Sequence, residues 1–190
     1  MIGILDIGSN TIRLVTYENG EYVSNISISS EILKDTFNKN LTETGTQNLC
    51  NSIKALKREA GDIKIYAFAT YAFRELENRE DVKKKILEET GILVEILSGK
   101  EEAECDFYGL KKEIGEEKSG IGVDLGGGSA QIFAFSGEQL DFYESYPIGA
   151  KRVKETFSKE KFPTREEKEK VEEYIEKALS SFDKKAEKLY

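Results

Sequence analysis

A short acidic segment rich in glycine and serine occurs twice in this chain of 190 residues, and it limits the possible folds more than any other feature. The first copy is DIGSN at residues 6–10, and the second is DLGGGS at residues 124–129. Each follows a short apolar run typical of a buried strand. Both segments are therefore predicted to be turns at strand ends.

The segments around the two turns follow the same pattern. Residues 2–6, 13–17 and 22–28 read as three antiparallel strands, with a hairpin signal at Asn19-Gly20. Residues 121–125, 131–135 and 140–146 repeat this arrangement, with a turn at Ser136-Gly137. Such internal duplication is more informative than either turn alone.

The remaining segments predict helices and further strands. The predicted helices cover residues 43–59, 79–89 and 100–113, a segment starting near Gly149, and a long segment from Pro163-Thr164 to Lys188. Strands are predicted at residues 63–69 and 93–97. With the three strands at the start of the chain, these make five strands before residue 118, and the fold class is α/β.

The chemistry of the two turns suits a phosphate and its cation. Glycines let the backbone come close to a ligand, and successive N–H groups can converge on an anion. Asp6 and Asp124 only accept hydrogen bonds, so they would hold a divalent cation or orient a water. Two strand-ending turns with incidental glycines are the alternative. A dinucleotide-binding turn fits poorly, because both segments lead into strands and lack the G-x-G-x-x-G spacing.

Composition removes several classes of function. The chain has no histidine, so any proton transfer falls to a carboxylate, lysine, tyrosine or cysteine. Cys50 and Cys105 lack metal-ligand spacing and are predicted to be reduced packing residues. A net charge of −8 argues against DNA binding. Without a signal peptide or a long apolar run, we expect a cytoplasmic protein with no membrane segment.

Three further segments accompany the two turns: ATYAFR at residues 69–74 followed by Asn78, LSGKEEA at residues 97–103, and PIGA at residues 147–150. With both turns and Arg13, they resemble the exopolyphosphatase/guanosine pentaphosphate phosphohydrolase (Ppx/GppA) family of the actin/sugar-kinase/Hsp70 superfamily, over nearly the whole chain. The resemblance implies an actin-like, ribonuclease H-like ATPase fold. A complete first lobe, with a mixed five-stranded sheet and helices, would cover residues 1–118, and the first half of a second lobe residues 119–190.

The resemblance also implies an activity, the release of terminal phosphate from inorganic polyphosphate or guanosine pentaphosphate with Mg²⁺ or another divalent cation. Each lobe would supply one phosphate loop to a shared cleft. Glu102 matches the family's catalytic base, and Arg74 matches an arginine that contacts phosphate. By residue type alone, Glu102 would be a solvated acid in an acidic run, and a helix-surface arginine paired with Glu75 or Glu77 is an equal alternative for Arg74.

The candidate site is therefore defined residue by residue. The candidate catalytic residues are Glu102, Arg74 and Gln131. The candidate phosphate-binding residues are Gly8, Ser9, Asn10, Arg13, Arg74, Gly126, Gly127, Gly128 and Ser129. The candidate metal ligands are Asp124 and Asp6. A structural role for Arg13 is an equal alternative.

Two positions depart from the family pattern. The family loop continues as GGGSTE, and its glutamate assists metal binding and catalysis, whereas Ala130-Gln131 stand here. Gln131 can orient a water but lacks the charge to act as a base, so we expect turnover slower by about 10²–10⁴-fold. Glu104 stands where the family usually has arginine.

The chain is also shorter than the family pattern. Family members carry a complete second lobe, and many carry a helical C-terminal module that helps to bind polyphosphate. We therefore expect a homodimer, or a missing C-terminal region, to cover the incomplete second lobe.

Three functions stay open on these residues. The first is a phosphoanhydride hydrolase. The second is a catalytically weak or inactive module that binds phosphate or a nucleotide through the same loops. The third is a kinase or ATPase of the same superfamily, which would need a nucleotide pocket in a complete second lobe.

Overall fold

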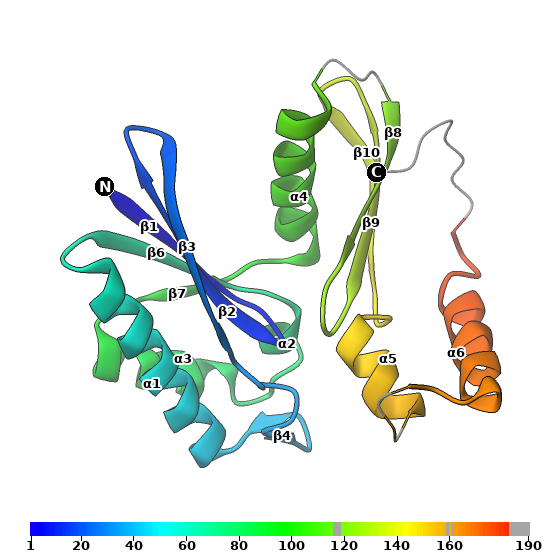
Figure 1. The fold of residues 1–190 in the computed structure, drawn as a ribbon, viewed down its shortest axis with the longest axis horizontal. Coiled ribbons are helices and arrows are strands. Elements are labelled where there is room, and N and C mark those ends of the chain that lie inside the picture. The colour runs from blue at the N-terminus through cyan, green and yellow to red at the C-terminus, as the bar shows by residue number, and fades with distance from the viewer. Residues whose placement is uncertain (116–118, 159, 161, 183–190) are drawn as a thin grey trace. The chain divides into compact units, whose positions relative to one another are not determined.

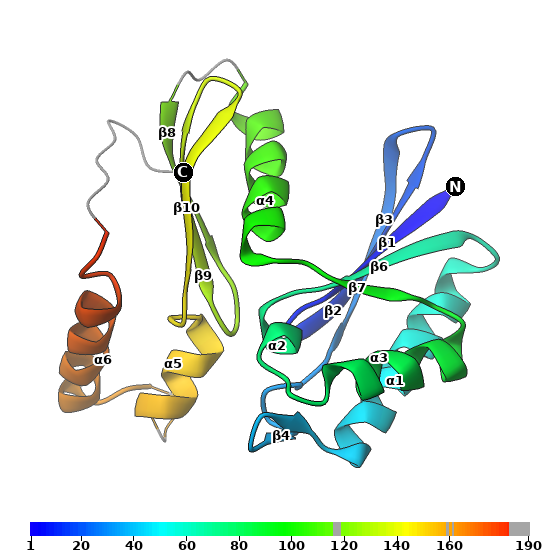
Figure 2. The same cartoon turned by 180° about the vertical axis from the view of Figure 1, so that it is seen from behind.

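The computed structural model describes residues 1–115, 119–158, 160 and 162–182. The chain divides into two compact units, Met1–Leu97 and Ser98–Tyr190, which are described separately. Figures 1 and 2 show the elements of each unit from opposite sides. Over the described residues, no helix combines the length and apolar character needed to cross a bilayer.

The first unit is built on a mixed five-stranded sheet with the order β3-β2-β1-β6-β7. Its strands are β1 (Ile2–Ile7), β2 (Thr11–Glu18), β3 (Glu21–Ser29), β6 (Lys64–Ala69) and β7 (Val94–Ile96). The first three strands run antiparallel, and β1, β6 and β7 pair in parallel. This sheet confirms the predicted α/β fold.

Three helices and a short hairpin complete the first unit. They are α1 (Glu43–Ala60), α2 (Tyr71–Arg74), α3 (Arg79–Thr90), and the pair β4 (Thr36–Phe37) and β5 (Asn40–Leu41). Helix α1 begins after Thr42, whose side chain accepts a hydrogen bond from the Gly45 N–H and so caps the helix. Residues at helical spacing on one face of α1, such as Leu49 and Ile53, are buried in one cluster with the strand residue Ile12. This cluster is the core of the unit.

The second unit is built on a three-stranded antiparallel sheet with the order β10-β9-β8. Its elements are α4 (Gly99–Ile114), β8 (Ser119–Leu125), β9 (Ala130–Ser136), β10 (Gln139–Tyr146), α5 (Ala150–Phe157) and α6 (Arg165–Ala178). Neighbouring residues of β9 point to opposite faces of the sheet. Phe133 packs with Phe107 of α4, whereas Ile132 belongs to a cluster with α5 and α6 residues.

The unit boundary and the predicted lobe boundary differ by one helix. The predicted first lobe ends at residue 118 and includes α4. In the structure α4 belongs to the second unit, because Phe107 packs on Phe133 and Phe135 at ring-centroid distances of 6.3 and 5.4 Å. Gly122 in β8 makes room for this packing, since a Cβ there would overlap the Phe133 ring.

The two three-stranded meanders repeat each other in register. Asp6 pairs with Arg13 across β1 and β2, and Asp124 pairs with Gln131 across β8 and β9. The offset is 118 residues in both cases (124 − 6 and 131 − 13). Each second hairpin also contains a bulge two pairs from its turn, and the register skips Val23 in β3 and Asp141 in β10. The predicted duplication thus holds without a gap from the loop through the hairpin.

One predicted element differs in length. The long helix was predicted to reach Lys188, but α6 ends at Ala178, with Leu179 outside the helical conformation. Ser180 and Ser181 follow, and serine competes for backbone hydrogen bonds at a helix end. Residues 183–188 of the predicted helix lie outside the described residues.

Candidate functional site

The first loop is tied down through its carbonyl groups. The N–H of Gly8 donates to the carbonyl of Thr11 at 3.0 Å and closes the turn between β1 and β2. The Ser30 hydroxyl donates to the Gly8 carbonyl at 3.1 Å, and the Ser30 N–H donates to the Asn10 carbonyl at 3.0 Å. Ser9 is buried, and Asn10 is exposed.

The second loop is closed in the same way. The N–H of Gly126 donates to the carbonyl of Ser129 at 2.9 Å. Helix α5 holds the loop from one side, because the Ala150 N–H donates to the Gly126 carbonyl at 2.9 Å. The N–H groups of Lys151 and Arg152 both donate to the Gly127 carbonyl at 3.0 Å. The first turn of α5 therefore uses its N–H groups to fix the loop.

These bonds determine where the loop N–H groups point. A carbonyl and the following N–H point in opposite directions across a trans peptide. Because the carbonyls of Gly126 and Gly127 face α5, the N–H groups of Gly127 and Gly128 point away from it. In the first loop, the N–H groups of Ser9 and Thr11 likewise point away from Ser30. Each loop thus turns N–H groups to the side opposite its anchor. In the second loop the two N–H groups are successive, as in an anion-binding nest.

Gly149 makes the second loop possible by its size. It precedes α5 in extended conformation (φ −61°, ψ 147°), so its backbone needs no special freedom. A Cβ at this position would lie 2.5 Å from the carbonyl carbon of Gly127, and closer still to the backbone of Gly128 and Ser129. Only glycine fits against the loop.

Gln131 lies beside the second loop and is 1% exposed. Its Nε2 donates to the Ser129 hydroxyl at 2.9 Å and to the Ser145 hydroxyl at 3.1 Å. Gln131 faces Asp124 on one neighbouring strand and Ser145 on the other. Ser145 was absent from the sequence-based site. In the sequence Ser145 is marked only by its position two residues before the PIGA segment. That position does not indicate a hydrogen bond with Gln131.

Glu102 lies in the first turn of α4, and one of its carboxylate oxygens, Oε2, is shielded from solvent. A capping box starts this helix: the Ser98 hydroxyl accepts from the Glu101 N–H at 3.2 Å, and the Glu101 carboxylate accepts from the Ser98 N–H at 2.8 Å. That backbone hydrogen bond is the main cause that lowers the pKa of Glu101. Gly99, the first residue of α4, lies against Ser145, since a Cβ on Gly99 would be 3.9 Å from the Ser145 Cβ. The helix end that carries Glu102 thus adjoins the strand next to Gln131.

The two candidate arginines lie in the first unit. Arg74, in α2, donates from Nη1 to the Leu97 carbonyl at 2.8 Å, and its guanidinium lies 5.8 Å from the centre of the Tyr71 ring. Arg13 is exposed and lies opposite Asp6 in the sheet, where an opposite charge is favourable. Arg74 thus has contacts within the first unit, and phosphate binding by either arginine stays a prediction.

The candidate metal ligands are also divided between the units, with Asp6 on β1 and Asp124 on β8. Asp124 and Asp106 of α4 line one pocket of about 330 Å³. Among the described residues, no three acidic or cysteine side chains gather into a metal-binding cluster. Mg²⁺ is commonly held by one or two carboxylates together with substrate phosphates and water, and Asp124 fits that pattern.

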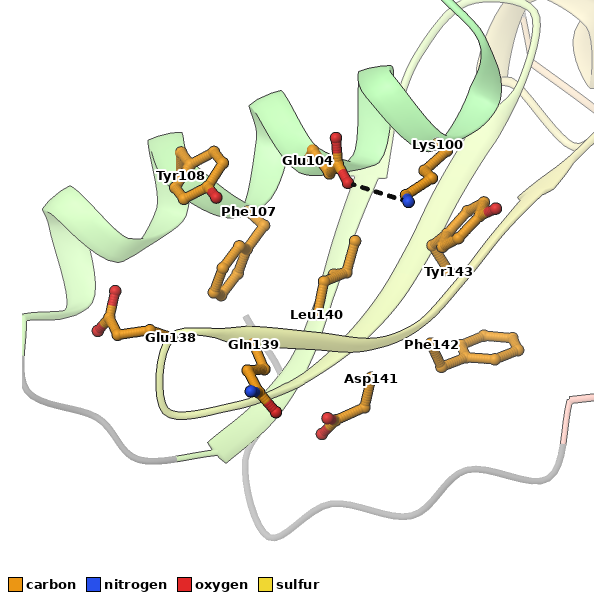
Figure 3. Close-up of a pocket in the computed structure, with 10 residues that line it drawn as sticks. All are labelled: Lys100, Glu104, Phe107, Tyr108, Glu138, Gln139, Leu140, Asp141, Phe142 and Tyr143. Carbon is orange, nitrogen blue, oxygen red and sulfur yellow. Dashed lines mark ion pairs between the residues drawn. The ribbon is translucent and has the colours of Figure 1, made fainter.

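A pocket of about 590 Å³ lies between α4 and the β9–β10 hairpin (Figure 3). Lys100 and Glu104 form an ion pair there at 3.6 Å, and the ring of Phe107 lies further along the helix. None of the candidate catalytic, phosphate-binding or metal residues lines this pocket. Glu104 lines the pocket, and its carboxylate is paired with Lys100.

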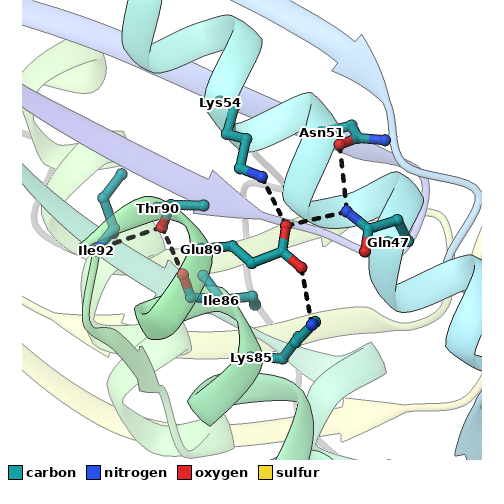
Figure 4. Close-up of polar contacts among 8 residues, drawn as sticks. All are labelled: Gln47, Asn51, Lys54, Lys85, Ile86, Glu89, Thr90 and Ile92. Atoms are coloured by element: carbon teal, nitrogen blue, oxygen red, sulfur yellow. Dashed lines mark hydrogen bonds and ion pairs between the residues drawn. The ribbon is translucent and has the colours of Figure 1, made fainter.

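The first unit has a pocket of about 570 Å³ beside Glu89 of α3. Figure 4 shows the polar contacts of Glu89. Glu89 accepts from Lys54 at 2.6 Å and from Gln47 at 3.0 Å, both on α1, and pairs with Lys85 at 3.0 Å. These hydrogen bonds, with Lys54 the largest cause, lower the pKa of Glu89 to about 2. Lys57 donates to the Thr90 carbonyl at 2.8 Å. This network joins α1 to α3 and belongs to the scaffold.

The two cysteines differ in environment. Cys50 is buried in the first core, as predicted, but Cys105 is exposed, so it is no packing residue. Desolvation of the sulfur, which is only partial at Cys105, is the main cause that raises the pKa of both thiols, and the acids around Cys105 add to it. Both thiols therefore stay protonated near neutral pH, and neither is an activated nucleophile.

Known proteins share both the sequence and the fold. Exopolyphosphatase 1 of Mycobacterium bovis is 31% identical over 163 residues, which cover 80% of this chain and 47% of that protein. Exopolyphosphatase 1 of Mycobacterium leprae is 27% identical over an alignment of 190 residues, which covers 94% of this chain and 56% of that protein. The crystal structure of the Aquifex aeolicus member of the Ppx/GppA protein family superimposes with a TM-score of 0.76 at 26% identity, over 99% of this chain and 64% of that one.

The chain thus spans about half the length of these curated relatives. The Ppx/GppA phosphatase family matches residues 22–189, which include the second loop, α4 and the segment around Gly149. With the repeated loops and the actin-like sheet of the first unit, this match assigns the family. The chain belongs to the Ppx/GppA phosphatase family.

Proposed function

We propose that this chain carries the phosphate-binding and water-activating groups of a hydrolase that releases terminal phosphate from inorganic polyphosphate. The second loop is the observation that carries the proposal. Its carbonyls are held by α5, its N–H groups at Gly127 and Gly128 point the other way, and the Ser129 hydroxyl lies beside them. Such a loop binds a phosphoryl group without a basic side chain, which suits a chain with a net charge of −8.

In the proposed reaction Glu102 is the general base. Its carboxylate takes a proton from a water as the water oxygen attacks the terminal phosphorus. The bond from that phosphorus to the bridging oxygen breaks, and the shortened polyphosphate leaves with the electron pair. The loop N–H groups and Ser129 bind the phosphoryl oxygens as charge shifts in the transition state.

The remaining candidates have supporting roles in the proposal. Mg²⁺, with Asp124 and Asp6 as the proposed ligands, would neutralise charge on the phosphate oxygens. Arg74 and Arg13 are proposed to contact phosphate, and Gln131 to orient polar groups beside the loop. Guanosine pentaphosphate is the second proposed substrate, since its terminal bond is also a phosphoanhydride.

Phosphate release from tripolyphosphate, with and without Mg²⁺, tests the hydrolase. Glu102→Gln should lower the rate by at least about 100-fold, the contribution expected of a positioned base, while the protein still binds the substrate. Glu104→Gln, on the same helix and paired with Lys100, is the matched control and should keep the rate. Equal rates in wild-type and Glu102→Gln protein would refute the role of Glu102.

A phosphate-binding module without turnover is the second candidate function. The neutral, buried Gln131 favours it, because a glutamine beside the loop cannot serve as a base. Calorimetry that shows tripolyphosphate binding, together with no phosphate release at any Mg²⁺ concentration, would select this function over the hydrolase.

The open edge of β8 supports a proposal about assembly. Among the described strands only β9 pairs with β8, and Leu125 at its end is 60% exposed. We propose that a second copy of the chain, or a further segment of the protein, covers this edge. Sedimentation velocity on the 190-residue chain checks the homodimer, and a stable monomer at high concentration counts against it.

A further inference from the structure

The hydrogen-bond pattern around Gln131 defines which way two hydroxyl groups can donate. A primary amide carries two N–H hydrogens, and those of Gln131 go to the Ser129 and Ser145 hydroxyl oxygens. Each serine oxygen therefore acts as an acceptor toward Gln131. The hydrogen of each hydroxyl is left to be donated elsewhere.

Both hydroxyls lie next to the second loop. Ser129 is its last residue and is 4% exposed. Ser145 lies on β10 directly opposite Gln131, and the first turn of α4 lies against it at Gly99. The N-terminus of this 16-residue helix carries partial positive charge, which favours an anion beside Ser145.

We infer that Ser145 is a second hydroxyl donor of the phosphate site, and that Gln131 is the positioning residue that turns Ser129 and Ser145 into donors toward one phosphoryl group. The inference rests on the proposed function of the second loop. Gln131 supplies this orientation without adding negative charge. The two serine hydrogen bonds to the ligand therefore require no cation beside residue 131.

The isosteric variant Gln131→Glu reverses the pattern. A carboxylate only accepts hydrogen bonds, so both serines would donate to residue 131 and would lose their hydrogens for the ligand. The added charge would also repel phosphate unless a cation stood between them. Metal dependence of binding is therefore the property that separates positioning of donors from a structural role.

Calorimetric titration with inorganic tripolyphosphate, in EDTA and then in Mg²⁺, tests the inference. In EDTA we expect Ser145→Ala to weaken binding by about tenfold, because hydrogen bonds to charged groups contribute about 1.5–3 kcal/mol and 1.4 kcal/mol is a factor of ten. Gln131→Glu should lose more than about tenfold in EDTA and regain most of it in Mg²⁺. Ser136→Ala is the matched control, since this exposed β9 serine bonds Asp141 and should bind as the wild type does.

The outcomes separate this inference from the proposed function. Wild-type binding with unchanged affinity in Ser145→Ala overturns the inference alone. Equal Mg²⁺ dependence in wild-type and Gln131→Glu protein also overturns it. Failure of the wild type to bind tripolyphosphate in either buffer overturns both proposals. Should Gln131→Glu not fold by circular dichroism, Ser145→Ala decides, because it removes only one half-buried hydroxyl.

Discussion

At the scale of single residues, the second loop depends on a glycine that leaves room for it and on an amide side chain that donates to it. Gly149 touches the loop backbone where any Cβ would collide with it. Gln131, on β9, supports the loop by donating a hydrogen bond to the Ser129 hydroxyl. A residue that never meets the ligand can therefore decide whether the loop keeps its shape.

Gly149→Ala should disturb the loop. The added methyl would overlap the backbone of residues 127–129, and such overpacking costs about 1–3 kcal/mol of unfolding free energy. Urea unfolding and tripolyphosphate titration should both report the loss. Gly109→Ala is the control: the site is exposed in α4 with no atom within 4 Å of the new Cβ, so stability should rise by about 0.5–1 kcal/mol with unchanged binding. Normal binding by Gly149→Ala would contradict the role given to this contact.

Glu89 should make the stability of the first unit depend on acid. Its pKa is lowered from an ordinary 4.5 to about 2, so its contribution is complete above about pH 4.5 and is lost as the pH falls through about 2. Wild type should unfold at higher urea than Glu89→Gln at pH 7, and the difference should vanish between pH 4.5 and 2. Glu88→Gln is the control, since that exposed carboxylate lies 3.9 Å from Lys84 and should change the urea midpoint little. A pH-independent difference for Glu89→Gln would refute the network's role.

The sequence identified residue types at the site better than it identified their partners. Glycine and serine at a strand end predict a phosphate loop, and both loops lie at strand ends. The partner of Gln131 depends on a bulge: an unbroken ladder from the pair of Ser136 and Gln139 would place Glu144 opposite Gln131, and the skipped Asp141 places Ser145 there. No local pattern in the sequence marks that skipped residue.

At the scale of elements, α4 and α6 begin with the same type of N-terminal cap and can be compared. Ser98 and Thr164 each begin a helix with a capping box, completed by Glu101 and Glu167. Only α4 carries a candidate catalytic residue. In the proposed reaction, order in its first turn therefore matters for function as well as for stability.

Ser98→Ala and Thr164→Ala should each lower the unfolding free energy by about 0.5–2 kcal/mol, the usual cost of losing a cap. Only Ser98→Ala should also slow phosphate release, because the freed first turn no longer fixes Glu102. Thermal unfolding and a steady-state assay on both variants check this. Equal rates in the two variants would mean that the first turn of α4 needs no cap for catalysis.

Long periodic elements were predicted, whereas α2, β4 and β5 were not. The strands of both meanders and helices α1, α3 and α4 were located within a few residues, because alternation and helical spacing extend over many positions. The four-residue helix α2 and the two-residue strands β4 and β5 are too short to show a period. They form through tertiary contacts, such as the bond from the Leu41 N–H to the Asn78 side chain at 3.0 Å.

At the scale of the whole molecule, the two units differ in how far the residues of their helices are buried. The first has a single buried cluster between its sheet and helices. In the second, α5 and α6 contain no buried residue, and the sheet has three described strands. The fold class could be predicted because the repeat is visible in sequence. The unit boundary could not be predicted, because α4 packs on its sheet through contacts of Phe107 with Phe133 and Phe135, which are distant in sequence.

Residues 1–97 should therefore fold as a separate protein. We expect a cooperative urea transition by circular dichroism from this fragment, because the described residues of its core all lie within residues 1–97. Residues 98–190 should unfold at lower urea. A fragment 1–97 without a cooperative transition would show that the first unit depends on the second.

The offset of 118 residues gives the protein an internal reference for experiments. Arg13 and Gln131 occupy equivalent places beside equivalent loops, one charged and exposed, the other neutral and buried. The shared bulges at Val23 and Asp141 keep the two hairpins aligned, so a residue exchanged between copies meets the same backbone. One polypeptide thus holds two natural variants of a single loop, and each can serve as the template on which the chemistry of the other is tested.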